Sequence, residues 1–93
     1  MPWIHATLSA ATDDPQALAA ALAREVALVT GLRPRDVVAL VSVAAAASGS
    51  GAVVVLAGAN RGDDVEASLV DAVRRTVAEA TGVSPDLVAV LRL

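Results

Sequence analysis

The chain reads Thr-Gly-Leu-Arg-Pro at residues 30–34 and Thr-Gly-Val-Ser-Pro at residues 81–85. In each copy the glycine suits the left-handed position that ends a helix, and the proline prevents the helix from resuming. Self-similarity at a fixed spacing is typical of repeated structural units. The two blocks, 51 residues apart, therefore predict a duplicated architecture.

The sequence on both sides of this block also repeats at that spacing, without a gap. Further identities pair Ala6 with Ala57, Asp13 with Asp64, Leu18 with Leu69, Arg24 with Arg75 and Val37 with Val88. We predict one domain, residues 1–93, because a chain of this length fits a single domain. Its repeats are residues 2–43 and 52–93, and the small, flexible segment 44–51 is the linker between them.

The first repeat predicts a strand, a helix and a second strand. Residues 2–8 mix Trp, Ile and Thr, and residues 37–43 are rich in β-branched valine. Between them, Asp13-Asp14-Pro15 is a helix start, with an aspartate cap and a proline whose missing N–H costs nothing there. The apolar residues of this helix are Leu18, Leu22, Val26 and Val29.

The second repeat predicts the same order. Residues 53–57 and 88–93 are the strands, and Asp63 or Asp64 caps the helix between them. The aspartates occur in pairs at both helix starts, and we interpret them as caps rather than as catalytic carboxylate pairs. One face of this helix carries Leu69, Val73, Val77 and Ala80.

Two such units predict an α/β fold, an α+β sandwich in which a four-stranded mixed sheet has both helices on one face. The strands of a β-α-β unit run parallel and are joined by a right-handed crossover. Alternation along the first strand directs residues 4, 6 and 8 toward the helices. It leaves Trp3, His5 and Thr7 on an open sheet face that must be covered.

The composition indicates an oligomer. The chain is 56% hydrophobic and 18% charged, and so small a domain buries only part of its apolar surface. A subunit interface would cover the remainder, so we expect an oligomer, either of identical chains or, as the alternative, a hetero-oligomer. The net charge is −3 and the chain has no lysine, which argues against nucleic acid as a partner.

Other classes are also disfavoured by composition. The chain has no cysteine and a single histidine, so we expect no metal and no cofactor. Arg24, Glu25, Arg33 and Arg35 interrupt the longest apolar stretches, so we expect no membrane-spanning segment. The N-terminus does not have the pattern of a signal peptide, and we expect a cytoplasmic protein.

The sequence resembles the tautomerase superfamily, near macrophage migration inhibitory factor and malonate semialdehyde decarboxylase. The resemblance rests on the start Met1-Pro2-Trp3-Ile4 and on the ends of the two units, Thr-Gly-x-x-Pro at 30–34 and Gly-Val-Ser-Pro-Asp at 82–86. It covers nearly the whole chain. It implies that Met1 is removed, that Pro2 is the catalytic residue, and that the chain forms trimers, as family members do; shorter single-unit chains form hexamers.

The chemistry of Pro2 supports the same assignment. Once Met1 is removed, Pro2 carries a secondary amine of limited freedom. An ordinary α-amino group has a pKa near 8, and desolvation or neighbouring cations lower such a pKa. A neutral amine can remove a proton next to a carbonyl and return it elsewhere.

Arg61 is the second candidate residue. It follows the third strand and precedes a helix start, where a guanidinium can bind a carboxylate through two parallel hydrogen bonds. By resemblance, it falls where decarboxylase-like members carry a catalytic arginine. The end of the third strand should lie beside the start of the first, so Pro2 and Arg61 should share one pocket. Trp3 could form its wall, and Arg33 is a further candidate for binding an anionic substrate.

The sequence departs from the migration-factor pattern at three positions. Leu32 stands where that branch has a substrate-binding lysine, with Arg33 one place later. Ala89 and Leu91 stand where it has tyrosine and asparagine, and the C-terminal extension of larger members is missing after Leu93. We therefore interpret the chain as a tautomerase-like enzyme acting on a small α-keto or enol carboxylate, with decarboxylation or hydration as related reactions. The alternatives are a non-catalytic oligomeric binding module of the same fold and one subunit of a hetero-oligomeric enzyme.

Overall fold

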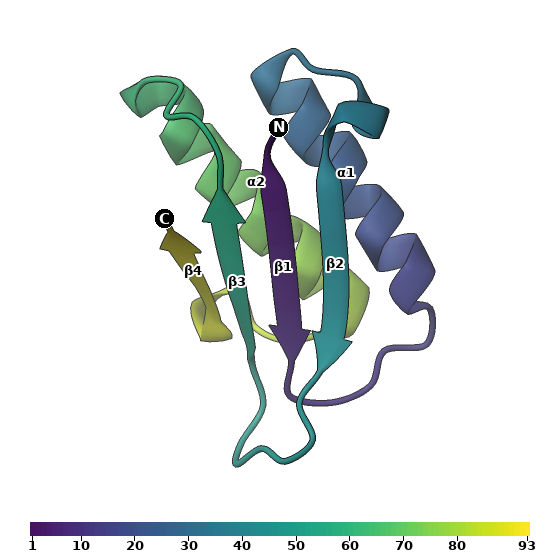
Figure 1. Cartoon of the computed structure of the whole chain (residues 1–93). Helices are drawn as coiled ribbons and strands as arrows, with labels where there is room; N and C mark the ends of the chain where they lie inside the picture. The colour runs from purple at the N-terminus through teal and green to yellow at the C-terminus, as the bar shows by residue number, and fades with distance from the viewer.

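A computed structural model describes residues 1–93. Two short 3-10 turns, Pro34–Asp36 and Pro85–Leu87, precede the second strand of each half. The four strands and two helices are, in chain order, β1 (Trp3–Leu8), α1 (Pro15–Thr30), β2 (Val38–Val43), β3 (Ala52–Ala57), α2 (Asp63–Thr81) and β4 (Val88–Arg92) (Figure 1). Neither helix is long and apolar enough to cross a membrane.

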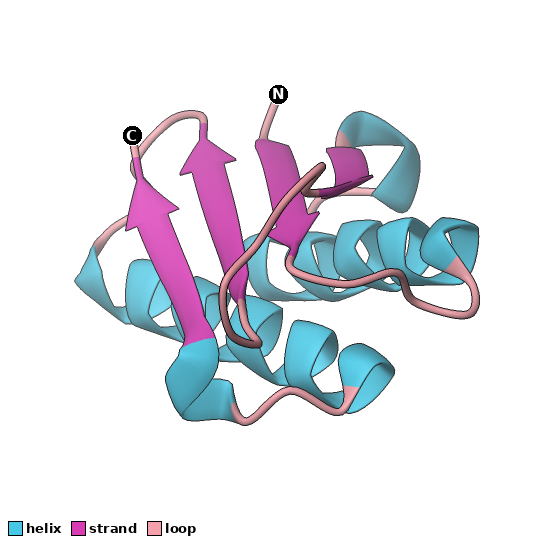
Figure 2. Cartoon of the chain, turned by 90° about the horizontal axis from the view of Figure 1, so that it is seen from below, coloured by secondary structure: helices cyan, strands magenta, loops and turns pink.

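The strands form one mixed sheet in the order β2-β1-β3-β4. Each β-α-β unit contributes a parallel pair, β1 with β2 and β3 with β4, and the units join through the antiparallel pair β1 and β3. Figure 2 shows both helices on the same side of the sheet. The predicted fold class is therefore confirmed.

Local sequence explains where the helices begin and end. The Asp14 side chain accepts a hydrogen bond from the Ala17 N–H at 2.9 Å and caps α1. Gly31 and Gly82 end the two helices with φ values of 76° and 75°, in the left-handed region that favours glycine. The prediction for α2 is wrong at its start: Gly62 is the cap, and Asp63 and Asp64 lie in the first helical turn. There they interact favourably with the positive end of the helix dipole.

The core lies between the helices and the sheet face that carries Ile4, Ala6 and Leu8. Side chains from both helices fill it, and each fully buried Leu or Val contributes about 1.5–3 kcal/mol. Ala80 is exposed, so its place on the apolar face of α2 was wrongly predicted, and Ala72 and Ala78 are buried instead. The largest fully buried side chains are Ile4, Leu18, Leu22, Val26, Val54, Val73 and Val77.

The gapless spacing of 51 is wrong for the first strand of each half. It holds for the helices, where Leu18 and Leu69 are both buried. It would pair Ala6 with Ala57, but Ala6 faces the helices, whereas Ala57 lies opposite Trp3 on the other face. Because side chains alternate along a strand, β1 and β3 correspond at a spacing of 50. Pro2 therefore corresponds to Ala52, the first residue of β3.

The open face of the sheet is apolar with one titratable group. The strand register places Trp3, His5 and Thr7 there, and the Nε2 atom of His5 lies 2.7 Å from Ser42 Oγ. Large apolar side chains are exposed around it: Trp3 to 50%, Leu40 to 46% and Leu91 to 53%. The residues of this face are Trp3, His5, Thr7, Val38, Leu40, Ser42, Val53, Val55, Ala57, Ala89 and Leu91.

Candidate active site

Pro2 is held at one end of the sheet, immediately before β1. Its carbonyl oxygen accepts a hydrogen bond from the Val38 N–H at 3.0 Å, which ties it to the start of β2. The residue is half-buried, whereas Met1 before it is 71% exposed. Removal of Met1 would leave the proline ring in place and free its nitrogen.

Pro2 and Arg61 line the same hollow, as the sequence predicts. Because β1 and β3 are antiparallel, Trp3 pairs with Ala57 and the start of β1 lies beside the end of β3. The hollow also contacts Trp3 and Arg92, together with apolar side chains of the core. Its volume is about 20 Å³, room for roughly one water molecule. A keto acid would need a wider site than one chain encloses.

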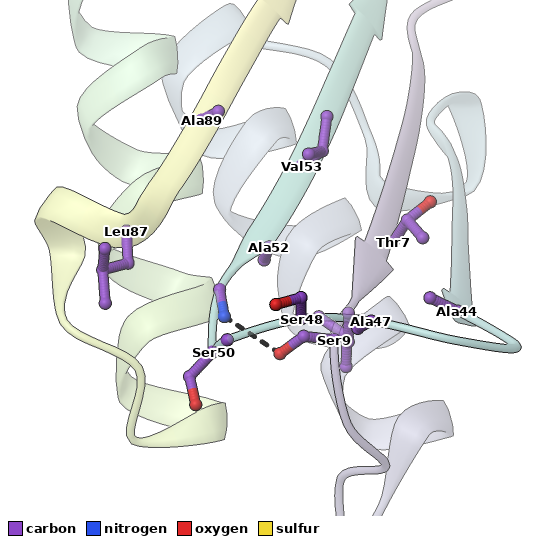
Figure 3. A pocket seen from close by; sticks show the side chains of 13 residues that line it. Thr7, Ser9, Ala44, Ala47, Ser48, Ser50, Ala52, Val53, Leu87 and Ala89 are labelled. Atoms are coloured by element: carbon purple, nitrogen blue, oxygen red, sulfur yellow. Dashed lines mark hydrogen bonds between the residues drawn. The ribbon is translucent and has the colours of Figure 1, made fainter.

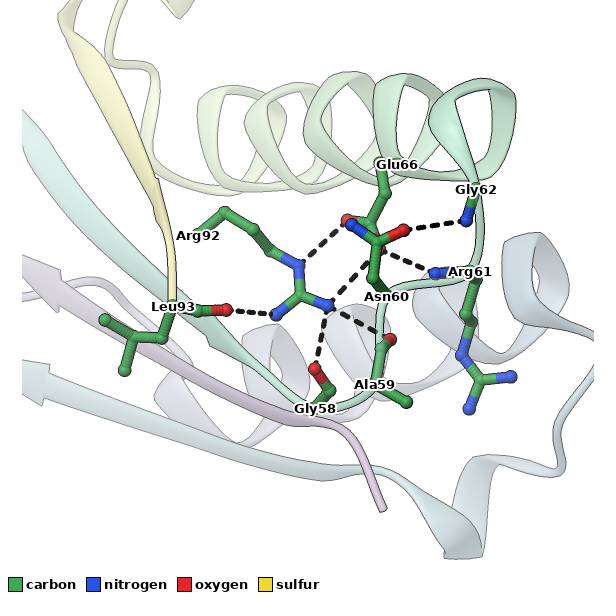
Figure 4. Close-up of polar contacts among 8 residues, drawn as sticks. All are labelled: Gly58, Ala59, Asn60, Arg61, Gly62, Glu66, Arg92 and Leu93. Atoms are coloured by element: carbon green, nitrogen blue, oxygen red, sulfur yellow. Dashed lines mark hydrogen bonds and ion pairs between the residues drawn. The ribbon is translucent and has the colours of Figure 1, made fainter.

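Arg61 lies in the loop Gly58–Gly62 between β3 and α2. Its backbone N–H donates to Glu66 Oε1 at 3.1 Å, and the Gly62 N–H donates to Asn60 Oδ1 at 2.9 Å. The guanidinium itself is exposed and makes no hydrogen bond or ion pair within the chain. In Figure 4 it points away from the polar cluster behind the loop. Arg61 is therefore an unpaired cation among the residues that line the hollow with Pro2.

Behind this loop, Arg92 and Glu66 form an ion pair. Arg92 Nε donates to Glu66 Oε2 at 2.8 Å, and the two side chains are only 24% and 15% exposed. The hydrogen bond from Arg92, aided by that from the Arg61 N–H, holds the pKa of Glu66 below its usual range. The Glu66 carboxylate in turn raises the pKa of Arg92.

Neither residue is among those that the sequence predicts for the site. Arg92 ends an otherwise apolar strand and lies opposite Leu56, whose side chain is in the core. It therefore projects toward the helices, where an unpaired charge would be costly. A charged residue on the inward-facing register of β4 was the available signal, but the register had to be known first.

Of the other residues that the sequence singled out, only Trp3 lies at the hollow. Trp3 lines the hollow, half of its surface exposed on the open face. Arg33 does not line it; its Nε donates to Asp36 Oδ2 at 3.0 Å on the surface. Ala89 and Leu91 lie on the open face and have no side-chain donor.

Gly58 brings the loop against the N-terminus. Its φ is +134°, and a Cβ placed on it would lie 3.2 Å from Pro2 Cα. We expect Gly58→Ala to cost about 1–3 kcal/mol of folding free energy through backbone strain, and more through displacement of Pro2. The measurement is urea unfolding beside Gly49→Ala, a control with φ +85° and open space around the new Cβ. Equal losses in the two variants would show that contact with Pro2 contributes nothing.

A larger hollow, about 360 Å³, lies at the opposite end of the sheet. Figure 3 shows it between the linker and the strands, with Thr7, Ser48, Ala52, Val53 and Leu87 around it. The Gly51 N–H donates to Ser9 Oγ at 2.9 Å at its edge. No ionisable side chain lines this hollow, so it offers neither a proton-transfer group nor an anion clamp.

Comparison with known proteins supports the fold. No family model matches the sequence, and no curated protein matches it. Among solved structures, a fused 4-OT symmetric trimer is similar, with a TM-score of 0.86 and 19% identity over 98% of this chain and 83% of that one. Pt0534 inactivated by 2-oxo-3-pentynoate gives 0.80 and 20%, over 99% and 82% of the two chains. The macrophage migration inhibitory factor of Giardia lamblia gives 0.84 and 18%, over 99% and 97%.

These neighbours are proteins of the tautomerase superfamily. The present chain, with two β-α-β units and the sheet order β2-β1-β3-β4, shares their fold, which is that of the tautomerase superfamily. The resemblance read from the sequence is thereby confirmed at the level of the fold.

Proposed function

We propose that the chain is a tautomerase-type enzyme that acts on a small α-keto or enol carboxylate through the amine of Pro2. The observation that carries the proposal is the shared hollow of Pro2 and Arg61. A base and an anion clamp are sufficient for keto–enol tautomerisation. Removal of Met1 converts the Pro2 nitrogen from an amide into the base.

In this mechanism the two residues have separate tasks. Arg61 binds the substrate carboxylate through two parallel hydrogen bonds and so orients the adjacent carbonyl. The Pro2 nitrogen removes a proton from the carbon next to that carbonyl, and the resulting ammonium returns it elsewhere on the substrate. Decarboxylation or hydration would use the same pair with a different substrate.

The proposal includes assembly into a homotrimer through the open sheet face. Three of the similar structures are described as trimers of fused 4-OT. The open face is rich in exposed apolar side chains and carries one titratable residue. The hollow at Pro2 holds only about one water in the isolated chain, so residues of a neighbouring subunit would form the rest of the substrate site.

A second candidate is a non-catalytic binding module of the same fold, and one observation favours it. The strand positions at which the migration-factor branch carries tyrosine and asparagine are Ala89 and Leu91, which leave the open face without donors there.

Two measurements distinguish the candidates. Intact mass should show a mature chain without Met1, and the purified protein should convert a panel of small α-keto acids between enol and keto forms. Retained Met1 leaves no free amine and would overturn the enzyme proposal. A processed chain with no activity on any member of the panel would favour the binding module.

A further inference from the structure

We propose that the Arg92–Glu66 pair is a positioning device that fixes the loop Gly58–Gly62 and thereby presents Arg61 to a substrate carboxylate. The inference rests on the proposed function. It assigns different tasks to the two arginines of the hollow: Arg61 contacts the substrate, and Arg92 acts through the loop.

The hydrogen bonds of Arg92 explain why it does not bind substrate. A guanidinium has five N–H donors, and those of Arg92 are largely used inside the chain. Nε and Nη2 donate to the two Glu66 oxygens at 2.8 and 3.2 Å, and Nη1 donates to the Leu93 carbonyl at 2.8 Å. Nη2 also donates to the carbonyls of Gly58 and Ala59 at 2.9 and 3.0 Å. Arg92 therefore has no free edge with which to bind a carboxylate through two bonds.

The same pair holds the loop from both sides. Arg92 binds the carbonyls at its beginning, and Glu66 Oε1 accepts the Arg61 N–H near its end at 3.1 Å. Figure 4 shows these contacts converging behind the loop, while the Arg61 side chain leaves on the other side. The backbone of Arg61 is thus fixed, and its guanidinium keeps all its donors.

The distribution of charge also indicates that Arg61, rather than Arg92, binds the substrate. Arg92 and Glu66 neutralise each other, so the unpaired positive charge of the hollow is that of Arg61. A substrate that pairs with it carries a single carboxylate. Loss of the Glu66 charge would release the loop and leave Arg92 without its counter-ion.

The test compares Glu66→Gln with Arg61→Ala on a keto acid and on its neutral methyl ester. We expect Glu66→Gln to lower kcat/KM for the acid by about 10- to 100-fold, mainly through KM, because the Arg61 guanidinium is misplaced. The kcat/KM for the methyl ester should be nearly unchanged. In the Arg61→Ala background the same change should have little further effect, since the two residues act as one unit. Glu79→Gln, an exposed change on the same helix, is the matched control.

Amide hydrogen exchange supplies a readout that needs no activity. Glu66→Gln should speed exchange of the Arg61 amide at neutral pH, and Arg92→Lys should do so as well, since a lysine cannot reach both loop carbonyls. Glu66 faces two cations, Arg92 from β4 and Arg61 from the loop, and Asp63 and Asp64 precede it on α2. Because folding lowers the pKa of Glu66, the protection is complete above the ordinary pKa of 4.5 and is lost as the pH falls through the lower pKa that Glu66 has in the folded chain. Wild type and Glu66→Gln should therefore converge at low pH.

The outcomes separate the two proposals. If Arg61→Ala impairs the acid substrate but Glu66→Gln alters neither KM nor exchange, the positioning role is overturned and the proposed function stands. If the wild-type protein is inactive, the proposed function fails. Unchanged exchange of the Arg61 amide in both Glu66→Gln and Arg92→Lys would overturn the positioning role of the Arg92–Glu66 pair as well.

Discussion

An N-terminal extension placed before Met1 is expected to lower enol–keto conversion by about 10²- to 10⁴-fold, which is the usual contribution of a positioned proton-transfer group. The extension keeps the Pro2 nitrogen in a peptide bond, where it has no lone pair for a proton. Pro2→Ala should lower this conversion less, because its N-terminus is still an amine, although a poorer base. The measurement is kcat/KM for a small α-keto acid with each protein, after intact mass has established where each chain begins.

The same amine can be tested by direct labelling. One similar protein, Pt0534, is inactivated by 2-oxo-3-pentynoate. An amine adds to the conjugated alkyne of such a reagent: the nitrogen–carbon bond forms, one π bond breaks, and the amine proton moves to the neighbouring carbon. The mature chain should therefore gain the mass of one whole reagent at Pro2, and the extended chain should gain none. Equal activity in wild type, Pro2→Ala and the extended chain would rule out the proposed base.

Leu40→Asp is expected to abolish the trimer. Leu40 lies opposite His5 on the open sheet face, which carries no arginine to pair with a new carboxylate. Burying an unpaired charge costs several kcal/mol, and the trimer would bury three copies. Since each 1.4 kcal/mol is a factor of about ten, dissociation should rise by more than about 10³-fold. Activity should fall with assembly if a neighbouring subunit completes the site.

Leu28→Asp is the matched control for this experiment. Leu28 is 72% exposed on α1, on the other side of the molecule from the open face, and receives the same charge. Sedimentation velocity over a wide concentration range should show a trimer for wild type and Leu28→Asp and a monomer for Leu40→Asp. A wild-type monomer at every concentration would contradict the homotrimer.

Much of the fold could be predicted because its signals are local. Gly31 and Gly82 mark the helix ends by the backbone conformation they permit, and alternation along β1 identifies the buried face. The antiparallel junction of the two units then places the start of β1 beside the end of β3, and so brings Pro2 to the loop of Arg61. These steps need only neighbouring residues and the symmetry of the repeat.

The rest depends on distant residues meeting in a particular register. The contact of Arg92 with Glu66 requires β4 to end level with the start of α2, which no local pattern encodes. The start of α2 was predicted wrongly because Asp63 and Asp64 looked like caps, whereas Gly62, at φ 96°, takes that position. The one-residue difference between the spacings of the strands and the helices was also hidden, since alanine is common enough to match by chance.

The duplication has a consequence for stoichiometry. Ala52, the counterpart of Pro2, lines the hollow at the opposite end, but its nitrogen is a peptide nitrogen joined to Gly51. A chain has two equivalent strand starts but only one beginning. Under the proposed function, an assembly of three such chains therefore has three reactive amines rather than six, and an amine-directed reagent should saturate at one per polypeptide.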